Sequence, residues 1–357
     1  MTINNEHNKL NVPNLRFPEF QEEWEEYRIE DITVNISSGR CKSHSSNGKY
    51  NLYGSTGIIG KTDEACYEGN LVLVARVGAN AGFLQIINEP CGITDNTLII
   101  KPKEVDVQYI YYFLQHFNLN RLIFGSGQPL ITGGMLKKVK VSLGTIQEQN
   151  KITRLLSILD ERITTQNKII DKLQSLIKGL RVRLIQIENG NIVHLGEIAR
   201  IYQPQTISST ELTEDGFLVY GANGIIGKYK EYNHKTEQIC ITCRGNTCGM
   251  VNYTKPMSWI TGNAMVINTD EHQNKVCKRY LYHYLSAYNF NSLISGSGQP
   301  QIVRTPLEQL KVTLPTFLEQ KQKATFLDKI QGKIEISNKT LNLYLQQKQY
   351  LVRQMFI

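Results

Sequence analysis

The pattern of hydrophobic positions is most regular in two long stretches, one in the middle of the chain and one at its end. In the first, about residues 146–186, apolar side chains recur at alternating spacings of four and three residues. The seam positions are Ile152, Leu156, Leu159, Ile163, Gln166, Ile170, Leu173, Ile177, Leu180 and Leu184. A repeat of this kind over several heptads is typical of a helix that packs against another helix. A helix of this length would be roughly 55 Å long at 1.5 Å per residue, which is the length of a spacer rather than of an ordinary core helix.

The second stretch, about residues 318–357, repeats the pattern less cleanly. Its matching positions are Leu327, Ile330, Ile334, Leu341, Tyr344, Leu351 and Met355. Lys323 and Lys348 interrupt the seam near its two ends, and Gly332 costs about 1 kcal/mol in a helix interior. We therefore expect this helix to depend on packing against the first one.

Each seam has one polar residue near its middle, Gln166 in the first and Ser337 in the second. If the two helices run antiparallel about a pseudo-twofold axis, these two side chains face each other. A buried polar pair would then fix the register at some cost in stability. The alternative is that Gln166 lies at the edge of the seam in contact with solvent, and the sequence leaves both open.

The blocks before the two helices, about residues 20–145 and 190–315, alternate short apolar runs with turns. Strands are expected at LVLVARV (71–77), TLIIKP (97–102), EQICITC (237–243) and AMVINT (264–269). The runs 107–123 and 277–294 are aromatic and amphipathic, which predicts helices that end at Gly-Ser-Gly-Gln-Pro turns. Their tyrosines follow the helical period, which favours a place in the core over base stacking.

The chain repeats itself. Residues 53–61, YGSTGIIGK, recur at 220–228 as YGANGIIGK, a shift of 220 − 53 = 167. Gly-Ser-Gly-Gln-Pro at 125–129 recurs at 296–300, and Glu148-Gln149 recurs as Glu319-Gln320, both shifted by 171. The order of block, long helix, block, long helix indicates a duplication. Loops at equivalent places in the two blocks, residues 37–49 and 202–216, differ in sequence, as loops that carry different specificities do.

The fold class predicted from these patterns is mixed α/β, with two repeated globular domains separated by two long coiled-coil helices, which run antiparallel if the two copies are related by a pseudo-twofold axis. The expected parts are an N-terminal tail at 1–19, a first domain at 20–145, a central helix at 146–187, a second domain at 188–315 and a final helix at 316–357.

The repeated motif superficially resembles a phosphate-binding loop, because Gly60-Lys61-Thr62 matches its last three positions. The spacing G-x-x-x-x-G-K-[ST] would place the first glycine at Ser55, however, whereas Gly54 lies one residue too early. In the second copy the lysine is followed by Tyr229, which does not bind Mg²⁺. The glycines and isoleucines are better explained by turns and a short strand.

Composition narrows the class of protein further. The chain has 357 residues, 41% of them hydrophobic and 20% charged, with no apolar run long enough to span a membrane and no signal peptide at its start. We therefore expect a cytoplasmic protein whose seven cysteines are free thiols. A zinc site at Cys240, Cys243 and Cys248 would need further ligands, for which His272, Cys277 and His283 are candidates only by composition. The three cysteines are therefore expected to be buried thiols. The net charge of +8 suits a polyanionic partner.

Several motifs together carry a family resemblance: Leu15-Arg-Phe-Pro18 at the start, the paired Tyr-Gly-x-x-Gly-Ile-Ile-Gly segments, the paired Gly-Ser-Gly-Gln-Pro turns, and the Glu-Gln pair that opens each long helix. In this order the chain resembles the specificity (S) subunits of type I restriction-modification systems over essentially its whole length. The resemblance implies two target-recognition domains, each reading one half of a bipartite asymmetric DNA site. It also implies two bound methyltransferase (M) subunits and motor-nuclease (R) subunits.

The residues agree with a role in binding double-stranded DNA rather than in catalysis. An adenine-N6 methyltransferase of this kind needs an [ND]-P-P-[YF] loop, and no two of the ten prolines are adjacent. We therefore expect no cofactor in this chain, with S-adenosylmethionine, ATP and Mg²⁺ bound by partner subunits, and no catalytic or metal-binding residues. The helices would set the number of unread base pairs between the half-sites. Two alternatives remain: a solitary DNA-binding or scaffold protein, and a nucleotide- or metal-dependent enzyme.

Candidate DNA-binding residues are the basic and amide side chains of the polar loops and strand ends, which suit phosphates and base edges. They are Arg40, Lys42, Lys49, Lys61, Arg76 and Gln128 in the first domain, and Gln203, Gln205, Lys228, Arg244, Gln299 and Arg304 in the second. Arg76 and Arg244 carry the most weight, because each follows an apolar strand at what we expect to be equivalent positions. Two alternatives stay open: the arginines could form structural ion pairs, and the glutamines of the Gly-Ser-Gly-Gln-Pro turns could only cap the turn.

Overall fold

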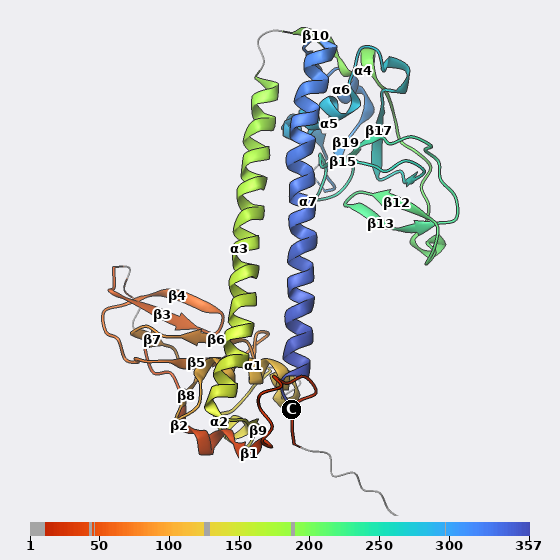
Figure 1. Ribbon diagram of the computed structural model, residues 1–357. Coiled ribbons are helices and arrows are strands. Elements are labelled where there is room, and N and C mark those ends of the chain that lie inside the picture. Colours follow the sequence, from red (N-terminus) through yellow and green to blue (C-terminus); the bar gives the residue numbers. More distant parts are fainter. Residues whose placement is uncertain (1–10, 43–44, 46, 125–128, 187–189, 297) are drawn as a thin grey trace, which may run out of the picture. The chain divides into compact units, whose positions relative to one another are not determined.

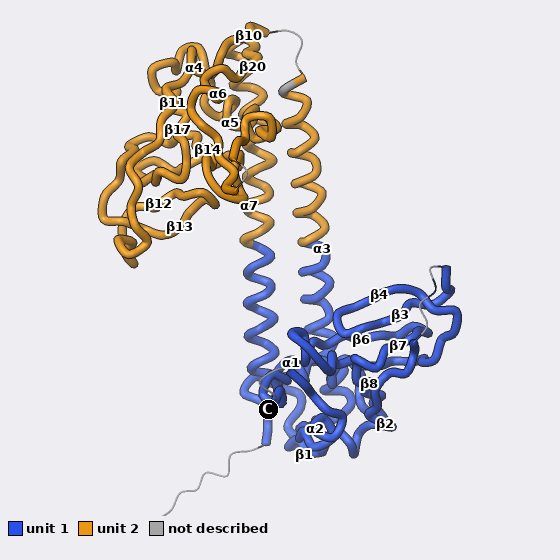
Figure 2. Tube along the Cα trace, turned by 180° about the vertical axis from the view of Figure 1, so that it is seen from behind, with its two compact units in different colours: residues 1–166, 340–357 blue, residues 167–339 orange. Residues whose placement is uncertain are grey.

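The structure is a computed structural model that describes residues 11–42, 45, 47–124, 129–186, 190–296 and 298–357. The chain forms two compact units (Figure 2). Unit 1 comprises residues 1–166 and 340–357, and unit 2 comprises residues 167–339. Each of the two long helices therefore contributes one segment to each unit.

Unit 1 contains three small sheets and two short helices. The four-stranded antiparallel sheet has the order β2 (Thr33–Ser38), β8 (Thr97–Pro102), β5 (Leu71–Ala75), β6 (Leu84–Ile87). The three-stranded sheet has the order β4 (Gly57–Thr62), β3 (Tyr50–Gly54), β7 (Cys91–Ile93), and β1 (Glu25–Arg28) pairs with β9 (Lys140–Leu143). The short helices are α1 (Val107–Phe117) and α2 (Gly133–Lys137) (Figure 1).

Unit 2 repeats this topology. Its four-stranded sheet has the order β11 (Arg200–Tyr202), β17 (Ala264–Asn268), β14 (Ile239–Thr242), β15 (Val251–Tyr253). Its three-stranded sheet has the order β13 (Gly224–Tyr229), β12 (Phe217–Gly221), β16 (Trp259–Ile260). Two further pairs are β10 (Asn191–His194) with β20 (Lys311–Leu314), and β18 (Ile294–Ser295) with β19 (Gln301–Ile302). The helices are α4 (Leu195–Ile198), α5 (Lys278–Ala287) and α6 (Arg304–Glu308). The predicted fold class and duplication are confirmed.

The predicted strands lie where the apolar runs place them, but the two aromatic helices are shorter than predicted. α1 ends at Phe117 because Asn118 adopts a left-handed conformation with φ of 59°, and a short 3-10 turn follows. α5 ends at Ala287, and its 3-10 turn begins after Asn289. Asparagine thus ends or follows each helix several residues before the glycine-rich turn that was expected to do so. The fully buried Tyr109 and Tyr280 confirm that tyrosines of these helices belong to the core.

The central long helix, α3 (Ile146–Ile185), has its partner in α7 (Phe317–Gln354). All ten predicted seam positions of α3 are buried or half-buried, and those of α7 follow the same rule. In unit 1 the seam residues Ile152, Leu156 and Leu159 share one hydrophobic cluster with Leu351 and Met355. In unit 2 a second cluster joins the seam residues Ile177 and Leu184 to Leu327, Ile330 and Ile334. The seam prediction is confirmed; whether Gln166 and Ser337 set the register stays a prediction.

Contacts in unit 1 give the direction of the two helix segments. The Leu15 amide donates to the Gln354 carbonyl at 2.9 Å, while its neighbour Arg16 binds Glu148. Twelve residues further along α3, Asp160 pairs with Lys348 at 2.6 Å. The segments therefore run antiparallel, as Figure 1 also shows for this unit. Lys348, which interrupts the apolar seam, is stabilised there by the carboxylate of Asp160.

A polar cluster attaches α5 to both long helices within unit 2. The fully buried His283 approaches Asp328 of α7 through Nε2 at 2.8 Å, and Arg181 of α3 donates from Nε to Nδ1 at 3.1 Å. Arg279 also pairs with Asp328. Because Nδ1 accepts from a guanidinium, His283 is held neutral with its proton on Nε2. Burial lowers the pKa of His283, and Arg279 and Arg181 oppose its protonation while Asp328 favours it.

The repeated glycine-rich motif is a β-hairpin in both units, not a nucleotide-binding loop. Residues 53–62 end β3, turn, and form β4, and the next regular element after Thr62 is a strand rather than a helix. The turn glycine Gly57 has φ of 132°, and its counterpart Gly224 has φ of 90°, a region that disfavours other residues. One isoleucine of each hairpin, Ile58 in unit 1 and Ile225 in unit 2, is more than half exposed.

Candidate nucleic-acid interface

In each unit, two backbone hydrogen bonds fix the residue that directly follows a buried central strand, β5 in unit 1 and β14 in unit 2. In unit 1 the Arg76 amide donates to the Asn96 carbonyl at 2.8 Å, and the Arg76 carbonyl accepts from Ile131 at 2.9 Å. In unit 2 the same two bonds belong to Cys243, which donates to the Asn263 carbonyl at 3.1 Å and accepts from Ile302 at 3.0 Å. Arg76 therefore corresponds to Cys243.

The expectation that Arg76 and Arg244 occupy equivalent positions is wrong by one residue. Arg244 corresponds to Val77, since Val77 bridges to Leu130 and Arg244 bridges to Gln301. Because successive side chains of an extended segment point to opposite faces, the two arginines leave their sheets on different sides. The apolar runs before the two arginines, 71–75 and 239–243, have the same length, but the second begins and ends one position later in its sheet. Only the hydrogen-bond register reveals this shift.

The Arg76 side chain is half-buried, and its Nε atom is buried without a hydrogen-bond partner. Within the described part of the chain, Arg76 makes no ion pair, so the structural carboxylate that was an alternative for this residue is not found there. A buried guanidinium N–H without a partner is costly in the free protein. A ligand that supplies a hydrogen-bond acceptor to Arg76 would remove this cost.

The other candidates of unit 1 are spread over its three-stranded sheet and the segment before it. Arg40, Lys42 and Lys49 are exposed, and Lys49 lies over the Tyr50 ring at 5.3 Å. Gln128 lies outside the described residues. In this unit no cavity that the structure describes brings these side chains together.

The two hairpin lysines already have acceptors. Lys61 donates to Asn51 Oδ1 at 2.7 Å, and Asn51 in turn donates to Glu89 at 2.6 Å. Hydrogen bonds from Tyr53 and Asn51 lower the pKa of Glu89, which keeps this carboxylate charged. Its counterpart Lys228 lies 3.5 Å from Asp215. Since both lysines are held near a carbonyl or carboxylate, a phosphate would have to compete for them.

In unit 2 three of the candidates meet around one small cavity of about 210 Å³. Gln203, Arg244 and Arg304 line its rim, together with Tyr202 and Gln301, which sequence reasoning missed. Its floor is apolar and consists of Met265 and Ile302, each only 3% exposed. Gln205 and Gln299 are exposed but do not line this cavity. Tyr202 and Gln301 could have been found only from the register between the strands.

The rim side chains differ in how firmly they are held. Gln203 donates from its amide nitrogen to the Gly262 carbonyl at 2.7 Å and to Cys243 Sγ at 3.2 Å. Arg304 pairs with Glu308 at 2.6 Å along α6. The Arg244 guanidinium makes no ion pair or side-chain hydrogen bond with any residue that the structure describes. Its N–H donors are therefore available to a hydrogen-bond acceptor outside the protein.

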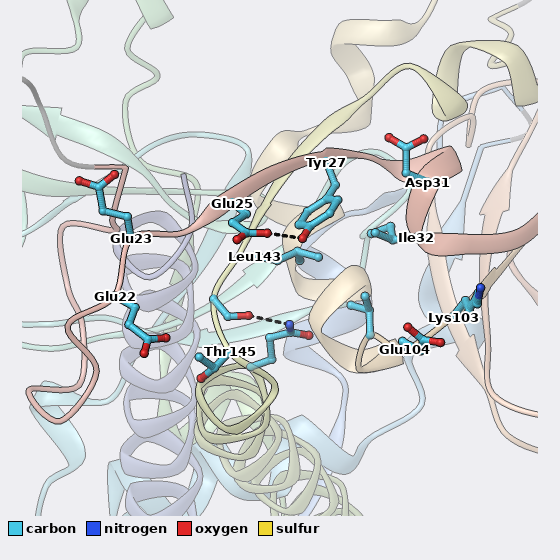
Figure 3. A pocket seen from close by; sticks show the side chains of 13 residues that line it. Glu22, Glu23, Glu25, Tyr27, Asp31, Ile32, Lys103, Glu104, Leu143 and Thr145 are labelled. Atoms are coloured by element: carbon cyan, nitrogen blue, oxygen red, sulfur yellow. Dashed lines mark hydrogen bonds between the residues drawn. The ribbon is translucent and has the colours of Figure 1, made fainter.

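A larger cavity in unit 1, about 390 Å³, has mainly acidic walls, whereas two arginines line the cavity of unit 2 (Figure 3). Its walls carry one lysine, Lys103, and the carboxylates of Glu22, Glu23, Glu25, Asp31 and Glu104. Such a surface repels a phosphate backbone, so size alone does not identify a DNA-binding face here. Cys240 and Cys243 are buried, as predicted, whereas Cys248 is only half-buried, and burial raises the pKa of the Cys240 thiol to about 12. None of the helices in the described part of the chain is apolar enough over its length to cross a membrane.

The fold and these surfaces define a class: a duplicated protein in which one α/β module, attached to a helix pair, occurs twice with different polar side chains at matching places. The family profile of the type I restriction modification DNA specificity domain matches residues 21–175 and 188–345. The chain belongs to this family, with two copies of its domain.

Individual relatives agree. The chain is 25% identical to the type I restriction enzyme MjaVIII specificity subunit of Methanocaldococcus jannaschii, over 95% of this chain and 92% of that protein. It is 33% identical to the EcoprrI specificity subunit of Escherichia coli, but over only 38% of this chain and 34% of that protein. Among solved structures, the S subunit of the type I restriction-modification system from M. genitalium superposes with a TM-score of 0.75 at 19% identity, covering 97% of this chain and 99% of that one.

Proposed function

We propose that this chain binds double-stranded DNA and that each unit reads one half of a bipartite, asymmetric site. One observation carries the proposal: the same backbone hydrogen bonds present different side chains in the two units, Arg244 in one and Val77 in the other. A duplicated scaffold with unlike surfaces is what recognition of two unlike half-sites requires. Membership of the specificity-domain family supports this reading.

The chain acts without chemistry of its own in this proposal. Two methyltransferase subunits bind the helices and methylate adenines, and motor-nuclease subunits join them to form the restriction complex. S-adenosylmethionine, ATP and Mg²⁺ are then bound by those partners, and the complex works on DNA in the cytoplasm. The hairpin geometry of residues 53–62 argues against the alternative of a nucleotide-binding enzyme.

The exposure of each candidate residue in unit 1 suits it to a different kind of contact with DNA. The exposed Arg40, Lys42 and Lys49 bind phosphates of one half-site, while Arg76 offers its unpaired Nε–H to an acceptor. Phosphate contacts of this kind weaken as salt rises, because bound counterions are released on binding. The helix pair sets the distance between the two half-sites, so its length determines the unread spacer.

Methylome sequencing of cells with and without this chain, in the presence of its methyltransferase, tests the proposal. A bipartite motif should appear only when the chain is present. Replacing residues 20–145 by the block of another family member should change one half of the motif, and a one-turn insertion into α3 should change only the spacer. A continuous motif, or methylation unaffected by deletion of the chain, would exclude the proposal in favour of a solitary binding or scaffold protein.

A further inference from the structure

The polar rim of the unit 2 cavity has no counterpart in unit 1, although the backbone positions correspond one by one. Ser37 pairs with Ile99 and Tyr202 pairs with Val266, and these partners occupy the same place in their sheets, so Ser37 matches Tyr202 and Ser38 matches Gln203. Likewise α2 and α6 begin at equivalent points. The residues of unit 1 that match Tyr202, Gln203, Arg244, Gln301 and Arg304 are Ser37, Ser38, Val77, Leu130 and Gly133.

The five rim positions are not needed to form the fold. Unit 1 forms the same sheets and the same strand-end hydrogen bonds with small or apolar residues at all five positions. The fold therefore does not need two arginines and two glutamines at this rim. Placing two cations beside one cavity costs repulsion and side-chain entropy, which a ligand rich in acceptors would offset.

The chemistry of the rim matches one kind of base pair. Arg244 presents the planar, bidentate donors that recognise guanine O6 and N7 in the major groove. Gln203 uses its amide nitrogen inside the protein, at Gly262 and Cys243, which leaves its oxygen as an acceptor for an amino group. A G·C pair offers both partners at one edge, two acceptors on guanine and an amino donor on cytosine.

We propose that unit 2 reads its half-site through this rim, with Arg244 and Gln203 bound to the major-groove edge of a G·C pair, and that unit 1 reads its half through different positions. The inference rests on the proposed function and adds to it the residues and the base pair. It assigns Tyr202 and Gln301 to specificity, and it gives the two units separate reading surfaces on one scaffold.

The experiment expresses the full chain with its methyltransferase and determines the methylated motif for a small set of variants. Arg244→Val places at this position the residue that unit 1 carries, and Gln203→Ser does the same at its own position. Each should broaden the motif at the same half, with loss of discrimination on the order of 10- to 100-fold at one G·C pair for Arg244→Val. The other half and the spacer should stay as in the wild type. The fivefold exchange to the unit 1 residues should abolish preference throughout that half.

Two further variants act as controls. Arg244→Lys keeps the charge but not the bidentate fork, so it should retain DNA affinity and lose base preference. Lys235→Ala removes an exposed charge of unit 2 away from the rim and should leave the motif unchanged. Co-purification with the methyltransferase and the unfolding midpoint report whether each variant is folded; the two single Arg244 variants carry the test if the fivefold exchange does not fold.

The outcomes distinguish the two proposals. If the wild-type motif is not bipartite, the proposed function itself fails. If the motif is bipartite and Arg244→Val leaves both halves unchanged, or broadens both, the assignment of the rim is wrong while the function stands. If the broadened position is an A·T pair, the rim reads DNA but the base-pair assignment is overturned.

Discussion

The N-terminal segment should stabilise unit 1 through one buried ion pair, and Arg16→Ala should remove most of that contribution. Glu148, near the start of α3, is fully buried. Its carboxylate accepts from Arg16 Nε at 2.7 Å, from Arg16 Nη2 at 2.9 Å and from Trp24 Nε1 at 3.0 Å. Hydrogen bonding to Glu148 raises the pKa of Arg16 further, so the guanidinium stays charged over the whole working pH range.

The magnitude follows from what Arg16→Ala leaves behind. The carboxylate would keep only the indole donor of Trp24 while remaining buried, and breaking a buried pair costs roughly 3–5 kcal/mol. The Arg16 side chain is 14% exposed, so water reaches the vacated space and the lower end, about 3 kcal/mol, is expected. In a unit of this size that is a fall of roughly 6–12 °C in the unfolding midpoint.

The chain offers a clean reporter for this measurement. It contains two tryptophans, Trp24 in unit 1 and Trp259 in unit 2. In a Trp259→Phe background, urea unfolding followed by fluorescence therefore reports on unit 1 alone. Trp259 Nε1 is buried without a partner, so removing that nitrogen should be well tolerated. Calorimetry on the same protein checks that the two units unfold as separate transitions.

A matched control exists at the corresponding position of unit 2. Glu319 follows the same Thr-x-x-Glu pattern as Glu148, but it is exposed and completes a capping box with Thr316, accepting from the threonine hydroxyl at 2.7 Å. Glu319→Ala should therefore destabilise less than Glu148→Ala. In a double-mutant cycle, Arg16→Ala and Glu148→Ala should be strongly non-additive. A loss below about 1 kcal/mol for Arg16→Ala, or additivity in the cycle, would refute the reasoning, since it would mean that the pair contributes no more than a surface ion pair.

Three other predictions concern the helices. Because burial lowers the pKa of His283 from its ordinary 6.5, the unfolded chain binds that proton first, and stability should fall as pH drops below about 6.5; His283→Gln should flatten this slope in urea titrations. Gln320→Ala should cost about 1 kcal/mol more than Gln149→Ala in unfolding experiments, because Gln320 makes three side-chain hydrogen bonds and Gln149 two. Gln166→Leu should raise the unfolding midpoint yet loosen helix register, and cysteine pairs engineered for the antiparallel register opposite Ser337 should fail to crosslink if that register is wrong.

Helices and strands with a regular hydrophobic spacing could be predicted well from the sequence. The seam of α3, the strands at 97–102 and 264–268 and the aromatic core helices follow from spacing alone, because burial of one face dictates the spacing. Helix ends were less accessible: Asn118 ends α1 through a left-handed conformation that many polar residues could in principle adopt. The Arg16–Glu148 pair joins residues 132 positions apart, and no local pattern signals it.

The candidate site shows a different limit. Charge and residue type led to Gln203, Arg244 and Arg304, which do meet at one cavity. The correspondence of Arg76 with Arg244 did not follow, because a shift of one residue between two similar strands reverses the face of every side chain. Such a shift is invisible in composition and becomes evident only from which amide bonds which carbonyl.

The hydrogen bonds within each unit explain how one scaffold can carry two specificities. The side chains of Gln149 and Gln320 each connect the start of a long helix to the start of an aromatic helix by hydrogen bonds to main-chain groups, whereas the strand-end bonds of Arg76 and Cys243 join main-chain atoms alone. Hydrogen bonds between main-chain atoms do not depend on the neighbouring side chains. The position after the strand end therefore tolerates valine in one unit and arginine in the other. A substitution at Arg244, which has no internal side-chain partner among the described residues, therefore changes the donors offered to DNA with little effect on the free energy of unfolding. The two half-sites of such a protein are free to diverge independently, which is the advantage of duplicating a recognition module rather than enlarging one.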